Sequence, residues 1–500
     1  MEVISSRYMK LLDLNSEYLG VPMLSLMENA GASVANVVRS RLSKGKVVVI
    51  AGTGNNGGDG MVAARHLASD YKVEVFLIGR ATRIRSEETL RNWKVLEGMD
   101  SVSTYVIEDR EGLETLREAL NDADIIIDAL LGTGVKGTLR GLYEEVVRLI
   151  NSSRGLKIAV DVPSGLDPDS GEVKGVAVKA DVTVTFHALK PGLTSAKEYA
   201  GEIIVKPIGI PPDASRICGP GDLYLVYKRR EPWSKKGDFG RVLIIGGSAY
   251  YSGAPALSAL ASLRTGSDLA VVACPKAVVN VIRSFSPNLI VRPVGEEFLT
   301  ENEVSALLEL SDSFDSIVVG PGLGLKEDTL RAVREFLRGL RPDKPVVVDA
   351  DALKALLKDL GVIKGKKAVL TPHAGEFKLL TGIKLTNDLR EREEAVIKLA
   401  RELNVTVLLK GHVDVISDGR VVKLNKTGNP GMTVGGTGDV LTGILATFLA
   451  WSGDPLESAC AAAFVNGVAG DMSKERLGYH LTATDLIEGI PKAMDKFLRV

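Results

Sequence analysis

Short β-branched runs alternate with segments of helical periodicity along the first 210 residues of the chain. An amphipathic helical pattern over 22–42, entered through Pro22, precedes the first run. The runs themselves predict strands at 46–51, 73–78, 124–129, 157–162 and 181–186. Such alternation is typical of βαβ units, so we predict an α/β fold with a mostly parallel sheet.

Prolines interrupt this pattern between 207 and 238, and a second α/β series follows. Its predicted strands are 241–246, 268–273, 315–319, 345–349, 367–371 and 405–409, with a hairpin of 413–417 and 421–424 around Asp418-Gly419. Five hundred residues exceed one ordinary core, so two domains are expected. We place them at 1–212 and 235–500, with a linker over 213–234.

Composition and charge exclude several classes of protein. The net charge is −1 and aromatic residues make up 5%, which disfavours a nucleic-acid or anionic-membrane partner. The three cysteines are far apart, and the histidines lack zinc-ligand spacing. We find no signal peptide and no apolar run long enough to span a membrane, so we expect a cytoplasmic protein.

The segment Ala51–Gly60, AGTGNNGGDG, follows the first predicted strand. Its glycines fit a dinucleotide-binding loop, in which backbone amides approach a phosphate at a helix N-terminus. An NAD-dependent dehydrogenase would also need an acidic residue after the next strand, where this chain has Gly79-Arg80. Arg80 would suit a 2′-phosphate instead, so a dehydrogenase remains an alternative at this point.

Two further polar loops follow the strands at 124–129 and 157–162. In an open parallel sheet they meet the first loop in one crevice. Asn56, Asp128 and Ser164 would then offer oxygens to a hard monovalent or divalent cation, and Asp161 is a candidate proton shuttle. Each aspartate taken alone is better explained as a helix or turn cap, but three converging loops favour a site.

The motifs Met27–Gly31, Asn55–Gly60, Gly132–Gly134, Asp161–Gly165 and Lys190–Leu193 resemble the N-terminal domain of the NAD(P)H-hydrate epimerases. The resemblance covers 1–210 and implies a Rossmann-like αβα sandwich whose substrate is hydrated NADH or NADPH, with R and S forms interconverted. It implies that Asp161 acts as acid or base at the reacting ring, and that Asn56, Asp128 and Ser164 bind K⁺. The implied hydrate contacts are Asn55, Asn56, Gly57, Gly58, Asp59, Gly132, Thr133, Gly134, Val135, Lys136, Gly137 and Thr138.

In the second half, the glycine-rich segment Thr427–Gly443 precedes a predicted helix at 439–450. Backbone amides at Gly435, Gly436 and Gly438 would surround an anion, and Asp439 could take a proton from a hydroxyl as a phosphoryl group arrives. The alternative is a glycine-rich helix start whose aspartate is favoured by the helix dipole.

This segment resembles the anion hole of ribokinase-like kinases, and further motifs resemble the NAD(P)H-hydrate dehydratases across 235–500. They are Ser252–Pro255, Gly320–Gly324, Asp349–Leu353 and Thr371–Glu376. The resemblance implies a ribokinase-like αβα domain that phosphorylates the S hydrate with Mg²⁺ and ADP or ATP and then eliminates phosphate. The lack of glutamine suggests a thermophilic prokaryote. The resemblance then favours ADP, the donor that prokaryotic members of the family generally use, but no residue decides between ADP and ATP.

By motif, Asp439 would be the catalytic base, and Ala254, Gly322 and His373 would contact the hydrate. The implied donor contacts are Lys410, Gly411, His412, Val413, Asp414, Val415, Gly435, Gly436, Thr437 and Gly438. Two departures from the family pattern stand out. Ala374 replaces the usual proline after the histidine, and the sequence His412–Asp414 places a carboxylate near the donor.

Together the two resemblances predict one bifunctional repair enzyme, an isomerase joined to a lyase. Its partners would be the hydrates NADHX and NADPHX and the nucleotide donor, and the resemblance suggests a homo-oligomer. The main alternative is a ribokinase-superfamily kinase for a vitamin precursor with an accessory N-terminal domain. A third reading gives the N-terminal domain a binding role only.

Overall fold

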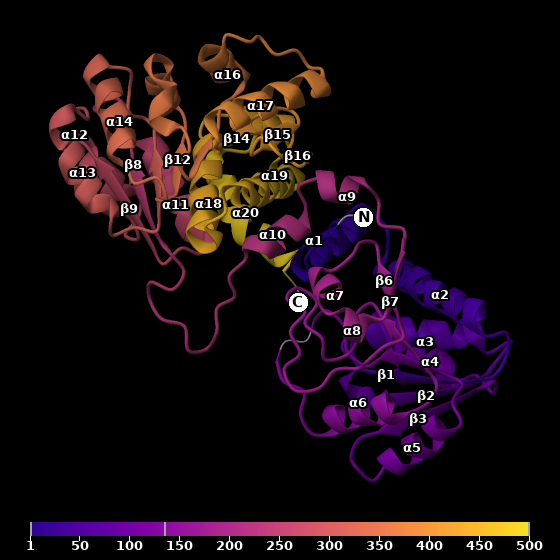
Figure 1. The fold of residues 1–500 in the computed structure, drawn as a ribbon. Coiled ribbons are helices and arrows are strands. Elements are labelled where there is room, and N and C mark those ends of the chain that lie inside the picture. The colour runs from indigo at the N-terminus through magenta and orange to yellow at the C-terminus, as the bar shows by residue number, and fades with distance from the viewer. Residues whose placement is uncertain (1–2, 135–136, 499–500) are drawn as a thin grey trace. The chain divides into compact units, whose positions relative to one another are not determined.

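Two mostly parallel sheets organise the chain, each in its own unit, Met1–Ala214 or Ser215–Val500. The computed structural model describes residues 3–134 and 137–498 (Figure 1). Within those ranges no helix combines the length and the apolar character needed to cross a membrane. Both sheets lie between layers of helices, so the predicted fold class is confirmed.

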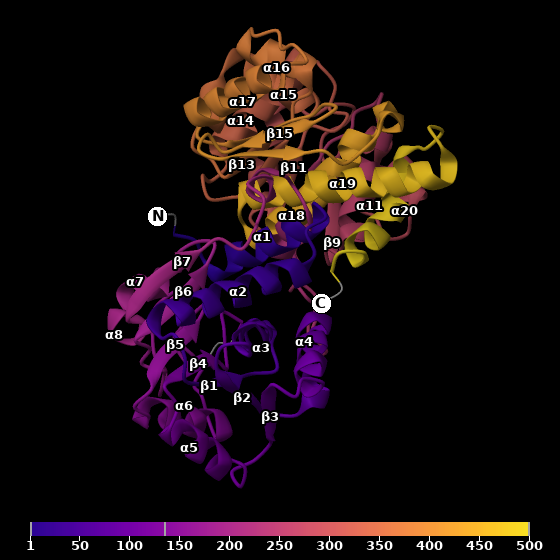
Figure 2. The ribbon, with the colours of Figure 1, turned by 90° about the vertical axis from the view of Figure 1, so that its right-hand side faces the viewer.

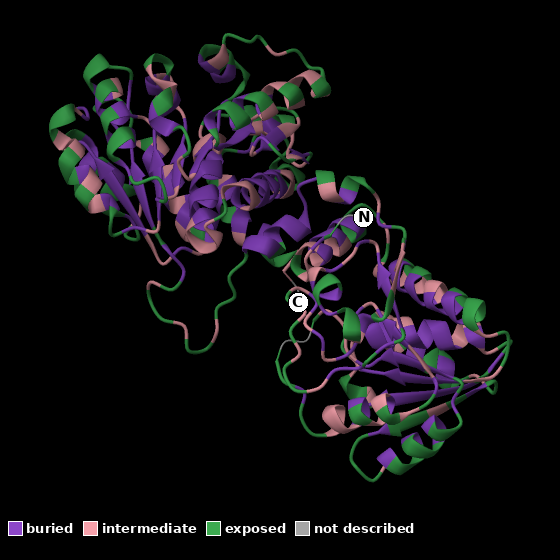
Figure 3. Cartoon of the chain, in the orientation of Figure 1, coloured by how far each residue is buried: buried purple, intermediate pink, exposed green. Residues whose placement is uncertain are grey.

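The first sheet has seven parallel strands in the order β3-β2-β1-β4-β5-β6-β7. The central strands are buried on both faces, which explains their unbroken apolar runs. Figure 3 shows these strands in the colour of buried residues. The bounds are β1 Lys46–Ala51, β2 Lys72–Ile78, β3 Val102–Ile107, β4 Ile125–Ala129, β5 Leu156–Val160, β6 Val182–Phe186 and β7 Glu202–Lys206.

Helices cover both faces of this sheet (Figure 1). Helix α3 packs between α2 and α4 on one face, and α5 and α6 share a buried cluster with the strands on the other. The helices are α1 Ser6–Tyr18, α2 Met23–Arg41, α3 Asn55–Leu67, α4 Glu87–Glu97, α5 Leu113–Asn121, α6 Leu142–Ser152, α7 Pro191–Ser195 and α8 Lys197–Ala200. This order of strands and helices is a Rossmann-like arrangement.

The second sheet has nine strands in the order β10-β9-β8-β11-β12-β13-β14-β15-β16. Strands β8 to β14 are parallel to their neighbours, and the predicted hairpin adds β15 and β16 antiparallel. The bounds are β8 Arg241–Ile245, β9 Leu269–Cys274, β10 Ile290–Pro293, β11 Ser316–Val319, β12 Val346–Val348, β13 Ala368–Leu370, β14 Thr406–Leu409, β15 Asp414–Ser417 and β16 Val422–Asn425.

Two separate buried clusters attach helices to the faces of the second sheet, as Figure 2 shows for α18 and α19 on one side and α14 to α17 on the other. The helices are α10 Pro220–Val226, α11 Gly253–Thr265, α12 Lys276–Phe285, α13 Val304–Ser311, α14 Glu327–Gly339, α15 Asp351–Ala355, α16 Ala374–Thr381, α17 Leu389–Leu403, α18 Thr437–Ser452, α19 Pro455–Leu477 and α20 Ala483–Asp495. Helix α9, Asp213–Arg216, spans the boundary between the units.

The segment 213–234, predicted as a linker, is in large part packed structure. Pro220 opens α10, at a position where the missing N–H costs nothing, and Leu223 and Val226 join the core with α19. Lys423 Nζ lies 2.6 Å from Asp222 Oδ1, a buried ion pair that ties α10 to β16. Residues 215–226 therefore fold with the second unit.

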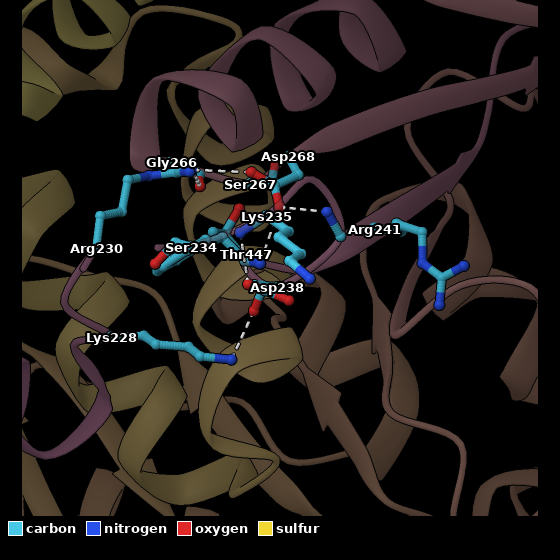
Figure 4. A network of polar contacts seen from close by, with 12 residues as sticks. Lys228, Arg230, Ser234, Lys235, Asp238, Arg241, Gly266, Ser267, Asp268 and Thr447 are labelled. Atoms are coloured by element: carbon cyan, nitrogen blue, oxygen red, sulfur yellow. Dashed lines mark hydrogen bonds and ion pairs between the residues drawn. The ribbon is translucent and has the colours of Figure 1, made fainter. Parts of the chain in front are cut away.

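The following residues, 227–240, are fastened to the same unit by a polar network (Figure 4). Asp268 accepts hydrogen bonds from Gly237 N at 2.7 Å, Phe239 N at 2.9 Å and Arg230 Nη2 at 3.0 Å. Burial alone would raise the pKa of Asp268, but these donors lower it below its usual value. Trp451 Nε1 donates to Phe239 O at 2.7 Å, so the segment is held on two sides.

Candidate active sites

The glycine-rich loop between β1 and α3 serves packing more than ligand approach. A Cβ atom at Gly52 would lie 1.9 Å from Leu130 O, and one at Gly57 would lie 1.9 Å from Gly52 O. Both glycines are therefore required by the tight turn against the end of β4. Only Gly54, the N-cap of α3, faces open space, so it is the place where a ligand can approach the helix N-terminus.

The three residues predicted to bind a cation come together around one carbonyl. Asn56 Nδ2 lies 3.0 Å from Leu131 O, and Ser164 Oγ lies 3.2 Å from the same atom. Asp128, fully buried on β4, accepts hydrogen bonds from Ser164 N at 2.8 Å and Ser164 Oγ at 2.6 Å. Three loops that are distant in sequence thus converge, as the strand order predicts.

The donor set at this point fits a hard cation. Burial raises the pKa of Asp128 to about 6, and the described residues supply no ion-pair partner for its carboxylate. Amide, hydroxyl and carboxylate oxygens are the ligands that such cations prefer. Within residues 3–134 and 137–498, no group of three or more His, Cys, Asp or Glu side chains is placed so that it could hold a metal ion.

Asp161 lies just beyond the end of β5, because the strand stops at Val160, two residues earlier than predicted. Its φ of +62° is a left-handed conformation, closed by a hydrogen bond of 2.8 Å from Val162 N to Val160 O. Such a backbone costs about 1–3 kcal/mol in a non-glycine residue and is concentrated at functional sites. The carboxylate forms an ion pair with Lys190 Nζ at 2.5 Å.

Two further carboxyl groups surround Asp161. Burial, followed by the charges of Asp161 and Asp13, raises the pKa of Asp59 well above its usual range. Burial also raises the pKa of Asp13 to about 6, with Lys10 opposing and Asp161 adding to the rise. Asp59 therefore holds its proton more tightly than an ordinary aspartate, and it lies near a carboxylate that is held in an ion pair.

The described part of the loop 132–138 lies next to the residues predicted to bind a cation. A Cβ atom at Gly132 would lie 3.1 Å from Asn56 Cβ, whereas Gly134 and Gly137 face open space. Thr138 packs near Gly175, and Val135 and Lys136 lie outside the described residues. A pocket borders this loop, lined by Leu131, Gly132, Gly137, Leu139, Gly165, Leu166, Asp167, Glu172 and Lys174.

In the second unit, Asp439 lies in the first turn of α18, which begins at Thr437 rather than at the predicted 439. Burial, and then the negative charge of Asp349, raises the pKa of Asp439 to about 7, although Lys410 lowers it. A carboxyl group with that pKa is well matched to proton transfer at neutral pH.

Lys410 lies beside this carboxyl and beside the glycine loop. Its Nζ is 2.8 Å from Asp349 Oδ1 and would be 3.5 Å from a Cβ atom at Gly438. Burial alone would lower the pKa of Lys410, but the charge of Asp349 and their hydrogen bond raise it above the usual value. Lys410 is therefore a fixed cation at the α18 N-terminus.

The glycine loop leaves its amides accessible on one side. Gly435 faces open space, whereas a Cβ atom at Gly436 would lie 2.7 Å from Leu257 Cδ1 in a left-handed conformation with φ +98°. Thr437 Oγ1 donates to Met432 O at 2.8 Å, so it braces the loop. Open amides and Lys410 together form a site suited to a phosphoryl group.

His373 is the N-cap of α16. Its Nδ1 accepts hydrogen bonds from Gly375 N at 3.0 Å and Glu376 N at 3.2 Å, while 59% of the side chain is exposed. A backbone bridge pairs His373 with Lys410, and Lys410 N donates to Pro372 O at 2.9 Å. His373 is thus both a helix cap and a neighbour of Lys410, which lies beside the glycine loop.

Ala254, in the first turn of α11, adjoins Gly322, which lies in the loop after β11. A Cβ atom at Gly322, where φ is +66°, would lie 3.6 Å from Ala254 Cβ and 2.9 Å from Tyr251 Cβ. Gly324 N donates to Asp351 Oδ2 at 2.9 Å, and the charge of Asp351 also contributes to the raised pKa of Asp439. Asp351 therefore lies near both the Gly320–Gly324 loop and Asp439.

Asp414 closes a turn within the protein. Its Oδ1 accepts from Gly411 N at 2.9 Å and its Oδ2 from Asn425 Nδ2 at 3.0 Å. Val415 is buried in β15, so only its backbone is open to a ligand role, whereas His412 is exposed. Arg392 Nη2 would lie 2.3 Å from a Cβ atom at Gly411, which places an unpredicted cation at this segment.

Several residues of both sites carry no signal in the sequence. Asp13 reaches its site only through the placement of α1, and Arg392 only through that of α17. Asp349 and Lys190 do lie in the motifs used above, but their sequence positions indicate no role. The contacts that Asp349 and Lys190 make in these sites join residues that are distant in the sequence.

The folds and sites define a two-unit α/β enzyme that joins a Rossmann-like unit to a kinase-like unit. The family model described as NAD(P)H-hydrate dehydratase matches residues 242–492, and that described as YjeF-related protein N-terminus matches 23–192. The chain belongs to the family of bifunctional NAD(P)H-hydrate repair enzymes. The family predicted from the motifs is confirmed.

Individual relatives agree over nearly the whole chain. The bifunctional NAD(P)H-hydrate repair enzyme of Pyrobaculum aerophilum is 49% identical and covers 99% of each chain. That of Methanothermobacter thermautotrophicus is 45% identical over 97% of this chain and 93% of its own. A solved ribokinase-like superfamily protein from Enterococcus faecalis V583 is 27% identical, with a TM-score of 0.50, over 57% of this chain and 97% of that one.

Proposed function

We propose that the first unit interconverts the R and S hydrates of NADH and NADPH, and that the second dehydrates the S form at the expense of ADP or ATP. Family membership over 99% of the chain supports this division. The observation that carries it is a separate acid–base carboxyl in each unit, Asp161 in one and Asp439 in the other. An accessory-domain kinase or a pure binding domain would not need both.

The epimerisation requires inversion at the carbon that bears the hydroxyl group. If the carbon–oxygen bond breaks, the leaving oxygen must gain a proton, and the returning water must lose one. Asp59, whose pKa is raised by burial, is suited to donate a proton, and Asp161, held by Lys190, has an oxygen, Oδ2, that accepts no hydrogen bond within the described residues. These two neighbouring carboxyl groups would supply both functions.

We assign K⁺ to Asn56, Asp128 and Ser164. Bound there, the ion would supply the positive charge that the buried Asp128 lacks. Asn56 contributes to both the cation group and the N-terminus of α3, so it would order the loop beside the hydrate. We also carry over, from the resemblance, the hydrate contacts at 55–59 and 132–138, of which Val135 and Lys136 lie outside the described residues.

In the second unit, Asp439 takes the proton of the ring hydroxyl while the hydroxyl oxygen bonds to the terminal phosphorus of the donor. The bond between that phosphorus and the donor's bridging oxygen breaks, and the shortened nucleotide leaves. Lys410 and the amides at 435–438 stabilise the transferred charge, and Mg²⁺ would accompany the donor. Phosphate then leaves the ring carbon, a proton is lost, and the double bond returns.

Within the resemblance we also assign epimerase activity to 1–212 and dehydratase activity to 235–500, in a cytoplasmic homo-oligomer. The three cysteines are buried free thiols, which suits a reducing compartment. Size-exclusion chromatography with light scattering measures the assembly directly, and a monomeric mass would refute the oligomer.

The proposal is tested by incubating the purified chain with mixed R and S hydrates of NADH, Mg²⁺ and either ADP or ATP. We expect the absorbance of reduced nicotinamide to return for both epimers, with one phosphate released per molecule. Spontaneous epimerisation, measured without protein, is the control. Accumulation of a stable phosphorylated product would instead favour a small-molecule kinase.

A further inference from the structure

Lys190 is a buried cation whose hydrogen-bonding capacity is used within the protein. Its side chain is 1% exposed, and its Nζ donates to Asp161 Oδ1 at 2.5 Å, to Thr185 Oγ1 at 2.9 Å and to Phe186 O at 2.9 Å. An ammonium group has three hydrogens, so these acceptors use all of them. Lys190 therefore acts on a ligand only through Asp161.

All the hydrogen bonds to the Asp161 carboxylate reach one oxygen. Oδ1 accepts from Lys190, from Thr185 Oγ1 at 3.1 Å and from Phe186 N at 3.3 Å. Within the described residues no hydrogen bond reaches Oδ2, while 15% of the side chain is exposed. The two oxygens have different tasks: one anchors the group and the other is available to a ligand.

The backbone around this carboxylate is fixed by the same contacts. Asp161 and His187 both have left-handed conformations, with φ of +62° and +63°, at the ends of the adjacent strands β5 and β6. Asp161 N donates to Val184 O at 2.8 Å, and the Lys190 contacts join the two strand ends. The direction of the Asp161 side chain thus depends on Lys190.

The charges that face Asp161 come from three elements: Asp13 lies on α1, Asp59 lies on α3, and Lys190 is the N-cap of α7. The charge of Asp161 raises the pKa of both Asp13 and Asp59. Lys190 lowers the pKa of both, and Lys10 acts on Asp13. Lys190 is thus the cation that directly contacts a group of three neighbouring carboxyls.

We propose that Lys190 is the positioning residue of the epimerase site, with Thr185 as its partner. It holds Asp161 by Oδ1, so that Oδ2 is the atom that exchanges the proton with the hydrate. This inference rests on the proposed epimerase function.

The test compares Lys190→Met, Lys190→Arg and Thr185→Val in the full chain, with kcat and KM measured for epimerisation of the R hydrate. For Lys190→Met we expect kcat to fall about 100-fold with KM little changed. Lys190→Arg should restore most of kcat, because it keeps a cation beside Asp161 Oδ1, and Thr185→Val should lower kcat by less than Lys190→Met does.

Dehydration of pure S hydrate by the second unit and thermal unfolding of each variant are the folding controls. An unchanged kcat in Lys190→Met, a loss of activity carried by KM alone, or an equal fall of kcat in Lys190→Arg would overturn the inference. If Lys190→Met fails to fold, an unchanged kcat in Thr185→Val would do the same. If the wild-type chain lacks epimerisation, the proposed function itself fails, which is a separate outcome.

Discussion

We propose the same role for Asp161 and Asp439, the transfer of a proton at the nicotinamide ring, yet the surroundings of the two carboxyl groups differ. Asp161 stands in a left-handed turn and is held by a buried lysine at 2.5 Å. Asp439 lies in the first turn of a helix, and its neighbour Lys410 donates to Asp349 instead. An ion pair holds the Asp161 carboxylate in place, whereas burial raises the pKa of Asp439 to about 7.

The comparison teaches that a nearby lysine has two uses. Lys190 fixes its carboxylate directly, whereas Lys410 is held by a different aspartate and stays beside the glycine loop, where a phosphoryl group would arrive. The two sites should therefore respond to separate substitutions, to pH and to K⁺ in separable ways.

The largest effect is expected from Asp439→Asn, which removes the proposed base of the second unit. Dehydration of S hydrate should fall by about three orders of magnitude, the range of general base catalysis. Equilibration of the R and S forms, followed by chromatography, should continue. Rapid recovery of NADH by this variant would show that another group takes the proton.

Asp161→Asn should abolish epimerisation, by about 100-fold or more, and leave dehydration of S hydrate intact. With mixed hydrates, the absorbance should return in a fast phase for S and in a slow phase for R at the spontaneous rate. A single fast phase that includes both epimers would contradict the role of Asp161.

Lys410→Met should weaken donor use by about tenfold and alter the pH dependence of dehydration. In the wild type the rate should rise with pH through about 7, because Asp439 must lose its proton to act as base. Lys410 lowers the pKa of Asp439, so its loss should move this limb to higher pH. The charge-preserving Lys410→Arg is the control, and a limb that stays in place in Lys410→Met would refute the electrostatic role.

Replacement of K⁺ by a large organic cation should slow epimerisation by about tenfold, with no effect on dehydration of S hydrate in the same solution. Asn56→Ala should raise the K⁺ concentration needed for half-maximal epimerisation. Equal inhibition of both activities would point to a general salt effect and not to the Asp128 group.

Most of the fold follows from the hydrophobic pattern, and the exceptions have physical causes. The strands β3, β7 and β10 were not predicted, because all three are edge strands with exposed or half-buried positions in place of a fully buried apolar run. The end of β5 was placed at 162, because apolar periodicity does not show a left-handed turn at Asp161. Helix α10 was not predicted, because Pro220 was interpreted as an interruption although it is the first residue of the helix. The helix packs against α19, and this contact is not visible in local sequence.

The proximity of candidate residues was predictable where they lie in short motifs after strands, and not where they meet through the fold. Asn56, Asp128 and Ser164 were expected to lie together, and the structure brings them together, while their binding of a cation stays a prediction. Asp13 comes from a helix with no motif, and the function of Lys190 depends on which oxygen of Asp161 it contacts. Neither fact is contained in local sequence.

The most direct test of two independent sites is complementation with pure R hydrate. Asp161→Asn and Asp439→Asn are each supplied with donor and Mg²⁺, first alone and then mixed. The account predicts that neither variant alone restores NADH faster than spontaneous epimerisation allows, and that the mixture does, because each supplies the site that the other lacks. A mixture as slow as Asp161→Asn alone, with both single-site assays intact, would contradict it.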